Sequence, residues 1–372
     1  MQQSVAVIQT FFSSSIRLLF RAGRFSNVAT TCPALRDRQA VPLFVILKMN
    51  LTKLKAIVYT KYGGPEVLQI KEIERPFPKD DEVLIKVHAV SINDWDFGLL
   101  EGDFINRLLN GLLKPKRKIL GSDIAGRIEA VGKNVTKFKT GDEVYGDLSG
   151  YWGGFAEYTC AREKSLVLKP ATMSFEEAAA IPQAAMLAVQ GLIDKGKIYV
   201  GQKLLINGAG GGVGTFAVQI AKLYGVEITA VDSTGKMDML RSIGFDHVID
   251  YTREDFTKNG QCYNLILDVK TNRSIFDYAR ALCPNGIYVT VGGSMGRLLQ
   301  ALILGPWISI ISKKHIRIVA LKTNKDLLFM NELFEAGKVK PVIEGPYKLN
   351  DFVEAFRLFG KAEHKGKVVI TM

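Results

Sequence analysis

The sequence GAGGGVG at residues 208–214 places five glycines within seven residues. Glycine loses more backbone freedom on folding than any other residue, so a cluster of this density needs a structural reason. The apolar run KLLIN (203–207) stands before it and predicts a buried strand, whereas TFAVQIAKLYG (215–225) after it predicts a helix. EITAV (227–231) then predicts a second strand, and Asp232 follows directly. Strand, glycine loop, helix, strand and acid form the order of a dinucleotide-binding unit.

The predicted role of the glycine loop is to hold a pyrophosphate. Glycines let the chain turn tightly and let backbone N–H groups approach the phosphates, and the helix starting near Gly212 adds free donors. Asp232 lies 18 residues past Gly214 (232 − 214), near the distance expected for an acid that binds the adenine ribose. The loop residues expected at the cofactor are Gly208, Ala209, Gly211, Gly212, Val213 and Gly214.

The rest of the chain divides into two kinds of pattern. After the glycine loop, helix-like MDMLRSIG and IFDYARALC alternate with strand-like HVIDY, LILDV and GIYVTVGG, as in a doubly wound parallel sheet. Before it, short strand-like runs are separated by Gly, Pro and Asp turns, which predicts a β-rich, partly barrel-like domain. We expect residues 49–180 to form the first part of that domain, residues 181–315 an inserted nucleotide domain, and residues 316–372 the end of its sheet and a return to the β-rich domain. A cleft between two such domains is a favoured ligand site.

Residues 1–48 differ from the rest of the chain and are predicted to lie outside the fold. SSSIRLLFRAGRF (13–25) could form a basic amphipathic helix, as in a mitochondrial or plastid transit peptide. The alternative is an untranslated extension, because Met49 begins a run that resembles a natural start, and a cytoplasmic protein is then expected. The leader carries a net charge of +5 of the total +12, from one acid, Asp37, and six basic residues: Arg17, Arg21, Arg24, Arg36, Arg38 and Lys48.

Composition excludes several classes of protein. No arginine-rich tract with interleaved aromatic residues is present, so nucleic acid is not an expected partner. The most apolar late segment, LLQALILGPWISIIS (298–312), is interpreted as broken by Gly305 and Pro306, and we expect buried or interfacial structure rather than a transmembrane span. No CxxC pair occurs, which predicts free thiols in a reduced compartment for the four cysteines, Cys32, Cys160, Cys262 and Cys283.

Seven motifs occur in an order typical of one superfamily: YGGPEVL, GSDIAGRIEAVG, KTGDEVYG, GGFAEY, EEAAAIP, GAGGGVG and GKVVI. Over roughly residues 53–372 the chain resembles the medium-chain dehydrogenase/reductase superfamily. Its glycine loop is one residue longer than in alcohol dehydrogenases and is similar to the AAAGGVG pattern of the zinc-free quinone oxidoreductases. The resemblance implies a Rossmann-type doubly wound parallel sheet domain inserted in a β-rich GroES-like domain. It also implies a homodimer built through a strand edge of the nucleotide domain.

The resemblance also predicts that no metal is bound. Zinc alcohol dehydrogenases have Cys where this chain has Asn93, His-Glu where it has Ser122-Asp123, and a further Cys near Gln183; the four-cysteine structural zinc loop is missing too. Zinc needs a tetrahedral set of thiolate, imidazole or carboxylate donors, which Asp123 alone does not provide. Without a Lewis acid, alcohol oxidation loses its main electrostatic help. Hydride addition to a quinone or to an activated C=C bond remains possible.

The cofactor prediction depends on the residues after the second strand of the unit. Asp232 could accept a hydrogen bond from the ribose 2′-OH of NADH, and its charge would repel the 2′-phosphate of NADPH. Ser233, Thr234 and Lys236 follow at once and suit a phosphate. The resemblance implies that Lys236 and Tyr251 hold this phosphate in NADPH-using quinone reductases, in which a small residue usually stands in place of Asp232. We favour NADPH, with NADH as the alternative and a solvated helix lysine as the alternative reading of Lys236.

Three side chains are candidates for chemistry. The resemblance places Asn93 beside the nicotinamide and the substrate, where it could donate a hydrogen bond to a quinone oxygen; the alternative is a turn-capping Asn. Tyr62 and Tyr145 lie in motifs near the expected cleft, and either could donate a proton unless it is simply packed. The end of the strand GIYVTV should let the chain pass close to the nicotinamide, at Val291, Gly292 and Gly293.

We therefore predict a zinc-independent oxidoreductase that transfers hydride from NADPH to a quinone or an activated C=C or C=O acceptor. One alternative is an enoyl-thioester or alkenal double-bond reductase. A second is a non-catalytic NADPH-binding sensor or partner protein, which would bind the cofactor and turn nothing over. The basic segment NRLLNGLLKPKRK (106–118) could favour an anionic or membrane-near acceptor, with a solvated loop as its alternative.

Overall fold

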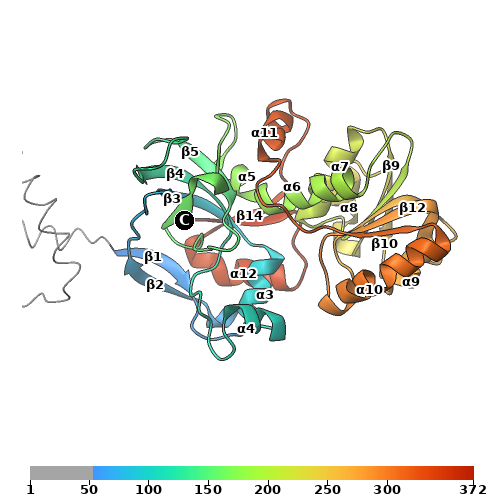
Figure 1. Cartoon of the computed structure of the whole chain (residues 1–372), viewed down its shortest axis with the longest axis horizontal. Coiled ribbons are helices and arrows are strands. Elements are labelled where there is room, and N and C mark those ends of the chain that lie inside the picture. Colours follow the sequence, from blue (N-terminus) through green and yellow to red (C-terminus); the bar gives the residue numbers. More distant parts are fainter. Residues whose placement is uncertain (1–52) are drawn as a thin grey trace, which may run out of the picture. The chain divides into compact units, whose positions relative to one another are not determined.

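The computed structural model describes residues 53–372, and the predicted leader 1–48 lies outside the described residues. One part of the described chain is a six-stranded parallel sheet, here called the nucleotide sheet, with the strand order β10-β9-β8-β11-β12-β13 (Figure 1). Its strands are β8 (Lys203–Asn207), β9 (Glu227–Asp232), β10 (His247–Asp250), β11 (Tyr263–Asp268), β12 (Leu282–Thr290) and β13 (His315–Ile318).

Helices cover both faces of the nucleotide sheet, as predicted for a doubly wound domain (Figure 1). Successive side chains of a strand point to opposite faces, so Leu204 and Ile206 of β8 pack in one core and Leu205 packs in the other. The first core includes α6 (Pro182–Val189), α7 (Gly212–Lys222) and α8 (Met237–Ile243), and the second includes α9 (Ile275–Ala281) and α10 (Met295–Ser312).

The second part is a seven-stranded sheet, here called the catalytic sheet, with the order β14-β15-β3-β4-β5-β7 and with β6 paired to β3. Its strands are β3 (Glu82–Ser91), β4 (Asp123–Val131), β5 (Glu143–Asp147), β6 (Tyr158–Arg162), β7 (Val167–Leu168), β14 (Ile343–Lys348) and β15 (Lys367–Thr371). The last strand, β15, pairs antiparallel with β3, so that Val369 lies opposite Ser91. The C-terminal strand β15 therefore lies in the same sheet as β3.

Short elements complete the catalytic domain and its junction with the nucleotide domain. β1 (Lys53–Val58) and β2 (Gln69–Glu74) form a separate two-stranded sheet. The helices are α3 (Asp94–Glu101), α4 (Phe104–Asn110), α5 (Phe175–Ala180), α11 (Leu327–Glu335) and α12 (Phe352–Gly360), with a π-helical turn at Gln190–Lys195 and 3₁₀ turns at Pro65–Val67, Glu163–Ser165, Thr234–Lys236 and Leu349–Asp351. Alanine-rich α5 and α6 share one core with both sheets, which holds the two domains against each other.

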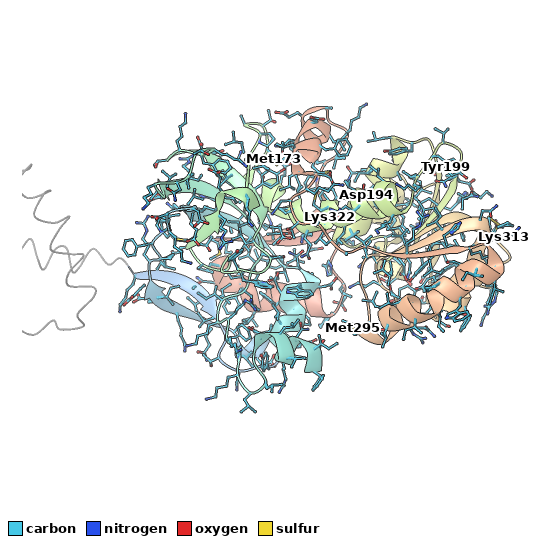
Figure 2. All side chains as sticks on the ribbon, in the orientation of Figure 1. Met173, Asp194, Tyr199, Met295, Lys313 and Lys322 are labelled. Atoms are coloured by element: carbon cyan, nitrogen blue, oxygen red, sulfur yellow. A yellow bond between two sulfur atoms is a disulfide. The ribbon has the colours of Figure 1, made fainter. Side chains whose placement is uncertain are left out.

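Helix α10 corrects the prediction that Gly305 and Pro306 break this segment, because the helix runs through both (Figures 1 and 2). Gly305 is buried, and a Cβ there would lie 3.0 Å from Ile316, so its small size lets α10 pack closely on β13. The outward face is apolar and exposed at Met295, Leu299, Leu302, Ile303, Trp307, Ile310 and Ile311, so the segment is not wholly buried, and the interfacial alternative stays a prediction.

Among residues 53–372, one helix, α10, is long enough and apolar enough to cross a membrane, judged by length and composition alone. A single helix of this kind is weak evidence for a span. The absence of a transmembrane segment stays a prediction.

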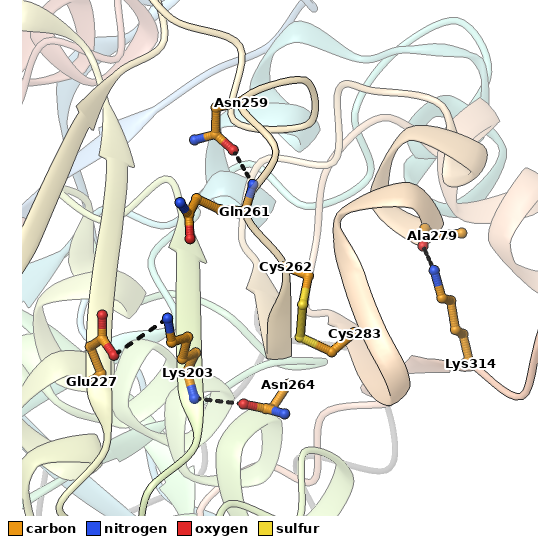
Figure 3. Close-up of a disulfide and its surroundings, with 9 residues drawn as sticks. All are labelled: Lys203, Glu227, Asn259, Gln261, Cys262, Asn264, Ala279, Cys283 and Lys314. Atoms are coloured by element: carbon orange, nitrogen blue, oxygen red, sulfur yellow. Dashed lines mark hydrogen bonds and ion pairs between the residues drawn. A yellow bond between two sulfur atoms is a disulfide. The ribbon is translucent and has the colours of Figure 1, made fainter.

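A disulfide joins Cys262 and Cys283, with 4.9 Å between their Cα atoms (Figure 3). Cys262 precedes β11 and Cys283 lies at the start of β12; the two strands pair in parallel with Tyr263 opposite Leu282, which brings the cysteines together. The prediction of free thiols is therefore wrong for this pair. Cys160 is free, and burial raises its pKa to about 12. Cys32 lies outside the described residues.

Candidate active site

A cavity of about 740 Å³ lies where residues of both domains meet. Its nucleotide side is formed by the segments that follow β8, β9 and β11, and its catalytic side by the segments around Asn93 and Lys367. From β8 the chain continues to β9 and β10 on one side and later to β11 on the other, so β8 and β11 flank the point where the strand order reverses. Ligands of doubly wound sheets bind at this point.

The glycine loop forms the wall of the cavity with backbone rather than side chains. Gly208 has a φ of +80°, a conformation that favours glycine, and turns the chain away from β8. Helix α7 begins at Gly212 without any side-chain cap, and Gly211 faces the cavity with no heavy atom closer than 3.8 Å to where a Cβ would lie. The free N–H groups of the first turn can therefore approach a diphosphate, so the residues present fit a dinucleotide.

The predicted loop residues divide between the cavity wall and its support. Gly208, Gly211, Gly212 and Val213 line the cavity. Ala209 is wholly buried behind them, and a Cβ on Gly214 would lie only 2.3 Å from the carbonyl oxygen of Ala209. Gly214 thus brings the helix close to the loop and is not part of the cavity lining.

Asp232 and Lys236 form a buried pair at one end of the cavity. Their side chains are only 9% and 7% exposed, and Lys236 Nζ lies 3.6 Å from Asp232 Oδ1. Asp232 Oδ2 accepts a hydrogen bond from the N–H of Gly210 at 2.7 Å, and Oδ1 accepts from the N–H of Ser233 at 2.8 Å. Burial lowers the pKa of Lys236. Asp232 therefore anchors the glycine loop, and its charge is balanced by an ammonium group.

Two predicted phosphate-binding residues near this pair, Ser233 and Tyr251, line the cavity together with Asp232 and Lys236. Thr234 does not line it, because its hydroxyl donates a hydrogen bond to Asp250.

Asn93 occupies the other end of the cavity, where α3 begins. Its backbone N–H donates to Asp96 Oδ2 at 3.1 Å. The backbone of Asn93 therefore takes part in the turn that begins α3, as the turn-capping alternative proposed. Its side-chain Nδ2 donates to Ser122 Oγ at 3.1 Å, and its Oδ1 accepts a hydrogen bond from Lys367 Nζ. An ammonium group can only donate, so the orientation of the carboxamide is defined, with Oδ1 towards Lys367 and Nδ2 towards Ser122 and the nearby Asp123.

Lys367 was missed by the sequence reasoning. It is 4% exposed, and its Nζ also donates to the carbonyl oxygen of Ile92 at 3.2 Å and lies 3.5 Å from Asp123 Oδ2. A Cβ on Gly212 would lie 2.5 Å from Lys367 Cδ, so that glycine makes room for the lysine. A lysine directly before the buried run VVIT was the signal that could have found it.

The positions that correspond to zinc ligands by resemblance converge beneath Asn93. The N–H of Gln183 donates to Asp123 Oδ2 at 3.1 Å, and Asp123 is fully buried. Burial raises the pKa of Asp123 to about 7, although the nearby Lys367 opposes that rise. The described part of the chain contains no group of three His, Cys, Asp or Glu side chains that could hold a metal ion. The donor set does not suit zinc, and binding of no metal stays a prediction.

Comparison with known proteins decides the family. Two family models match, "Alcohol dehydrogenase GroES-like domain" at residues 79–171 and "Zinc-binding dehydrogenase" at residues 243–370. The chain is 36% identical over 99% of its length to the 2-methylene-furan-3-one reductase of Solanum lycopersicum, of which 92% is covered. The chain belongs to the medium-chain dehydrogenase/reductase superfamily.

Two further relatives place the chain in the quinone oxidoreductase-like group of this superfamily. It is 33% identical to the chloroplastic NADPH-dependent alkenal/one oxidoreductase of Arabidopsis thaliana, over 86% of the chain and 79% of the relative. The structure of the quinone oxidoreductase from Coxiella burnetii superposes with a TM-score of 0.75, at 26% identity, over 86% of this chain and all of that one. This protein is therefore an oxidoreductase that uses a nicotinamide cofactor.

The two predicted proton donors of this medium-chain reductase lie elsewhere. The hydroxyl of Tyr62 donates to the carbonyl oxygen of Gly111 at 2.6 Å, and the hydroxyl of Tyr145 donates to Asn331 Oδ1 at 2.7 Å. Neither tyrosine lines the cavity, and burial raises the pKa of both. Both are packed residues in this structure, and we leave them out of the proposed site.

Of the three predicted residues that follow β12, Gly293 lines the cavity, and Val291 and Gly292 do not. Gly293 lines it with a φ of +117°, and a Cβ there would lie 2.5 Å from the backbone nitrogen of Thr271. Gly292 accepts hydrogen bonds on its carbonyl oxygen from Thr271 and Thr290, at 2.5 and 3.0 Å, and stands behind the wall together with Val291.

Lys270 and His364 also line the cavity of this reductase and were not predicted. Lys270 Nζ lies 3.3 Å from Asp94 Oδ1, so an ion pair joins the two domains at the cavity. His364 is 7% exposed and stacks on Phe359. Burial, together with the nearby lysines, lowers the pKa of His364 to about 4.

Proposed function

We propose that this protein reduces the activated C=C bond of an α,β-unsaturated carbonyl compound, or a quinone, with hydride from NADPH. The observation that carries the proposal is a single cavity with a diphosphate-binding helix end at Gly212 and a buried polar group, Asn93, facing the same space. The relatives support it by name, since they include a 2-methylene-furan-3-one reductase and an alkenal/one oxidoreductase.

In the proposed reaction NADPH supplies the hydride, and the chain supplies binding and orientation. The N–H groups of the first turn of α7 bind the diphosphate. On the catalytic side of the cavity, Nδ2 of Asn93 binds the acceptor oxygen, because the contacts with Ser122 and Lys367 fix the orientation of its carboxamide. A fixed donor of this kind orders the acceptor next to the hydride donor and lowers the entropic barrier.

We further propose that NADPH is preferred over NADH. The argument against a 2′-phosphate was the charge of Asp232, and in the structure that charge is balanced by Lys236 and bound by the N–H groups of Gly210 and Ser233. Asp232 then has a structural task in this chain, and Lys236, Ser233 and Tyr251 remain to bind the phosphate.

The decisive experiment uses the chain that begins at Met49. Consumption of NADPH is followed by absorbance with a cyclic enone, a benzoquinone, 9,10-phenanthrenequinone and an enoyl thioester, each with and without a metal chelator. We expect turnover that the chelator does not change. Tight NADPH binding without turnover of any acceptor would instead favour the non-catalytic sensor, and turnover limited to enoyl thioesters would favour the runner-up enzyme.

We also propose that the protein is a homodimer formed at the β13 edge of the nucleotide sheet. β13 is the last strand of that sheet, and the apolar outward face of α10 lies beside it. Covering this face would remove Ile310 and Ile311, which are 77% and 80% exposed, from water. Light scattering should give twice the chain mass for wild type and the monomer mass for Ile310→Lys/Ile311→Lys; a monomeric wild type contradicts the proposal.

The location of the protein depends on the leader. Relatives named chloroplastic and the acid-poor composition of residues 1–48 support import into an organelle, whereas synthesis from Met49 would leave the protein in the cytoplasm. Fluorescent fusions of residues 1–372 and 49–372 decide between these alternatives, since only the first should enter an organelle.

A further inference from the structure

We propose that Lys367 is a catalytic residue whose ammonium group stabilises the oxyanion that forms on the acceptor during hydride transfer. The inference rests on the proposed function and deepens it, because it assigns the charge that the reaction needs. Lys367 lines the cavity that contains the glycine loop, and it contacts Asn93, the residue proposed to bind the acceptor oxygen.

The position of the ammonium group is defined from several sides. Nζ donates to Asn93 Oδ1 and to the carbonyl oxygen of Ile92, and it lies 3.5 Å from Asp123 Oδ2. The stem of the side chain passes next to Gly212 and so runs along the N-terminus of α7. A charge held by such contacts is already oriented before the reaction and needs little reorganisation during it.

The surroundings of Nζ are the positions that hold zinc in metal-containing relatives by resemblance. In this chain they carry Asn93, Ser122-Asp123 and Gln183, and the side chains of Asn93 and Asp123 contact the ammonium group. A lysine therefore places one positive charge where the metal-containing members place a cation. Asp123 acts as the counter-ion, and its Oδ1 has no hydrogen-bond partner among residues 53–372.

The proposed step balances without any further reagent. With an enone, hydride from NADPH forms a C–H bond at the β-carbon, and the C=C pair moves to give an enolate with its charge on the oxygen. The ammonium group of Lys367 stabilises that oxygen and stays protonated, while water supplies the proton that completes the saturated ketone. With a quinone, the same two-electron transfer gives a hydroquinone anion, which takes its proton from water.

A lysine that only supported Asn93 would act differently from one that stabilises an oxyanion. A structural role lowers the rate for every acceptor by a similar factor. A stabilising charge matters most for a simple enone, because its enolate is a strong base with localised charge. It matters less for a quinone, whose hydroquinone anion disperses charge over the ring.

The test compares Lys367→Met with wild type in single-turnover hydride transfer at saturating NADPH, with a cyclic enone and with a benzoquinone. Removal of one oxyanion-stabilising group should slow enone reduction by ~100- to 1,000-fold, and quinone reduction by less than ~10-fold. Lys236→Met is the matched control, since it removes a buried lysine from the same cavity, and its losses should be equal for both acceptors.

Removing the lysine leaves Asp123 buried without its cation, so Lys367→Met could be unstable for that reason alone. Lys367→Met/Asp123→Asn removes both charges and should show the same acceptor-dependent loss in a stable protein. Equal losses for both acceptors, or no loss, in an active protein would overturn the role of Lys367. A wild type that reduces neither acceptor would overturn the proposed function itself, and the inference with it.

Discussion

Two buried lysine–aspartate pairs contribute a lysine to the cavity wall, and they differ in what surrounds the carboxylate. Lys236 lies 3.6 Å from Asp232, and Lys367 lies 3.5 Å from Asp123. Asp232 accepts two backbone N–H bonds besides its lysine contact. Asp123 accepts one backbone N–H bond, from Gln183, and a 3.5 Å bond from the Ser91 hydroxyl, both on Oδ2, and Oδ1 has no hydrogen-bond partner among the described residues.

The first pair thus holds the glycine loop in place, and the second is an ion pair whose carboxylate is fully buried. Distance alone therefore does not define the role of a buried pair. The other contacts of the carboxylate decide how much it depends on its lysine.

The largest expected effect concerns stability. Removing one partner of a buried pair destabilises by ~3–5 kcal/mol when the other stays charged, so we expect Lys367→Met to lose stability towards that range as the pH rises above 7, because Asp123 is fully buried and its pKa is about 7. Lys236→Met should be much milder, since Asp232 retains its backbone donors. Urea unfolding of both variants measures the difference, and Lys367→Met/Asp123→Asn should recover most of the loss. Equal losses of stability for the two lysine variants would show that Asp232 and Asp123 depend equally on their lysines.

The second effect concerns the cofactor. A hydrogen bond to a charged group is worth ~1.5–3 kcal/mol, so Lys236→Met should lower kcat/KM for NADPH by ~10- to 100-fold and change that for NADH less than ~3-fold. Lys270→Met is the control, because Lys270 lines the same cavity and is more exposed. A matching loss with NADH would show that Lys236 supports the loop and does not read the phosphate.

The third effect concerns pH. His364 is buried and neutral, and its pKa is lowered to about 4 by burial and by nearby lysines. Its stabilising contribution is therefore present above the unfolded pKa of ~6.5 and is lost as the pH falls towards 4.

We expect this loss to reach ~2 kcal/mol in urea unfolding of wild type between pH 6.5 and 4, relative to His364→Phe. Asp123 has a raised pKa and acts in the opposite direction, losing stability as the pH rises to about 7. The difference between wild type and His364→Phe isolates the histidine, and parallel curves would contradict its buried neutral state.

The smallest expected effect is the influence of each of the two lysines on the pKa of His364. Among the charges that lower the pKa of this histidine, Lys236 ranks before Lys367. Lys236→Met should raise the His364 pKa more than Lys367→Met does, because Lys236 lowers that pKa more strongly. NMR titration of the imidazole resonances measures both shifts, and the reverse order would show that His364 is coupled mainly to the Asp123 end.

Most of the cavity-lining residues on the nucleotide side were named from the sequence, whereas Lys367, Lys270 and His364 were not. The glycine loop, Asp232 and Lys236 lie within one continuous unit of the chain, where local spacing predicts which residues meet. Tyr62 and Tyr145 were chosen from motifs that run close to the cleft, but their hydroxyls bond to Gly111 and Asn331 instead. Motif membership places a residue on the correct strand or turn and does not say which way its side chain points.

The disulfide and α10 show the same limit. Cys262 and Cys283 are 21 residues apart with no motif between them, and only the parallel register of β11 and β12 brings them together. Gly305 and Pro306 predicted a break, yet the helix continues, because the missing side chain of Gly305 allows close packing on Ile316. Packing overrides local propensity wherever it buries enough apolar surface.

The sequence by itself determined the family and the doubly wound domain with its glycine loop, because these depend on periodicity and on motifs that are continuous in the chain. Only the tertiary structure decided that Lys367 meets Asp123, since these residues are 244 positions apart (367 − 123) on different strands. This contact follows from the pairing of β15 with β3 and of β3 with β4. No local sequence pattern specifies the register of such long-range pairing.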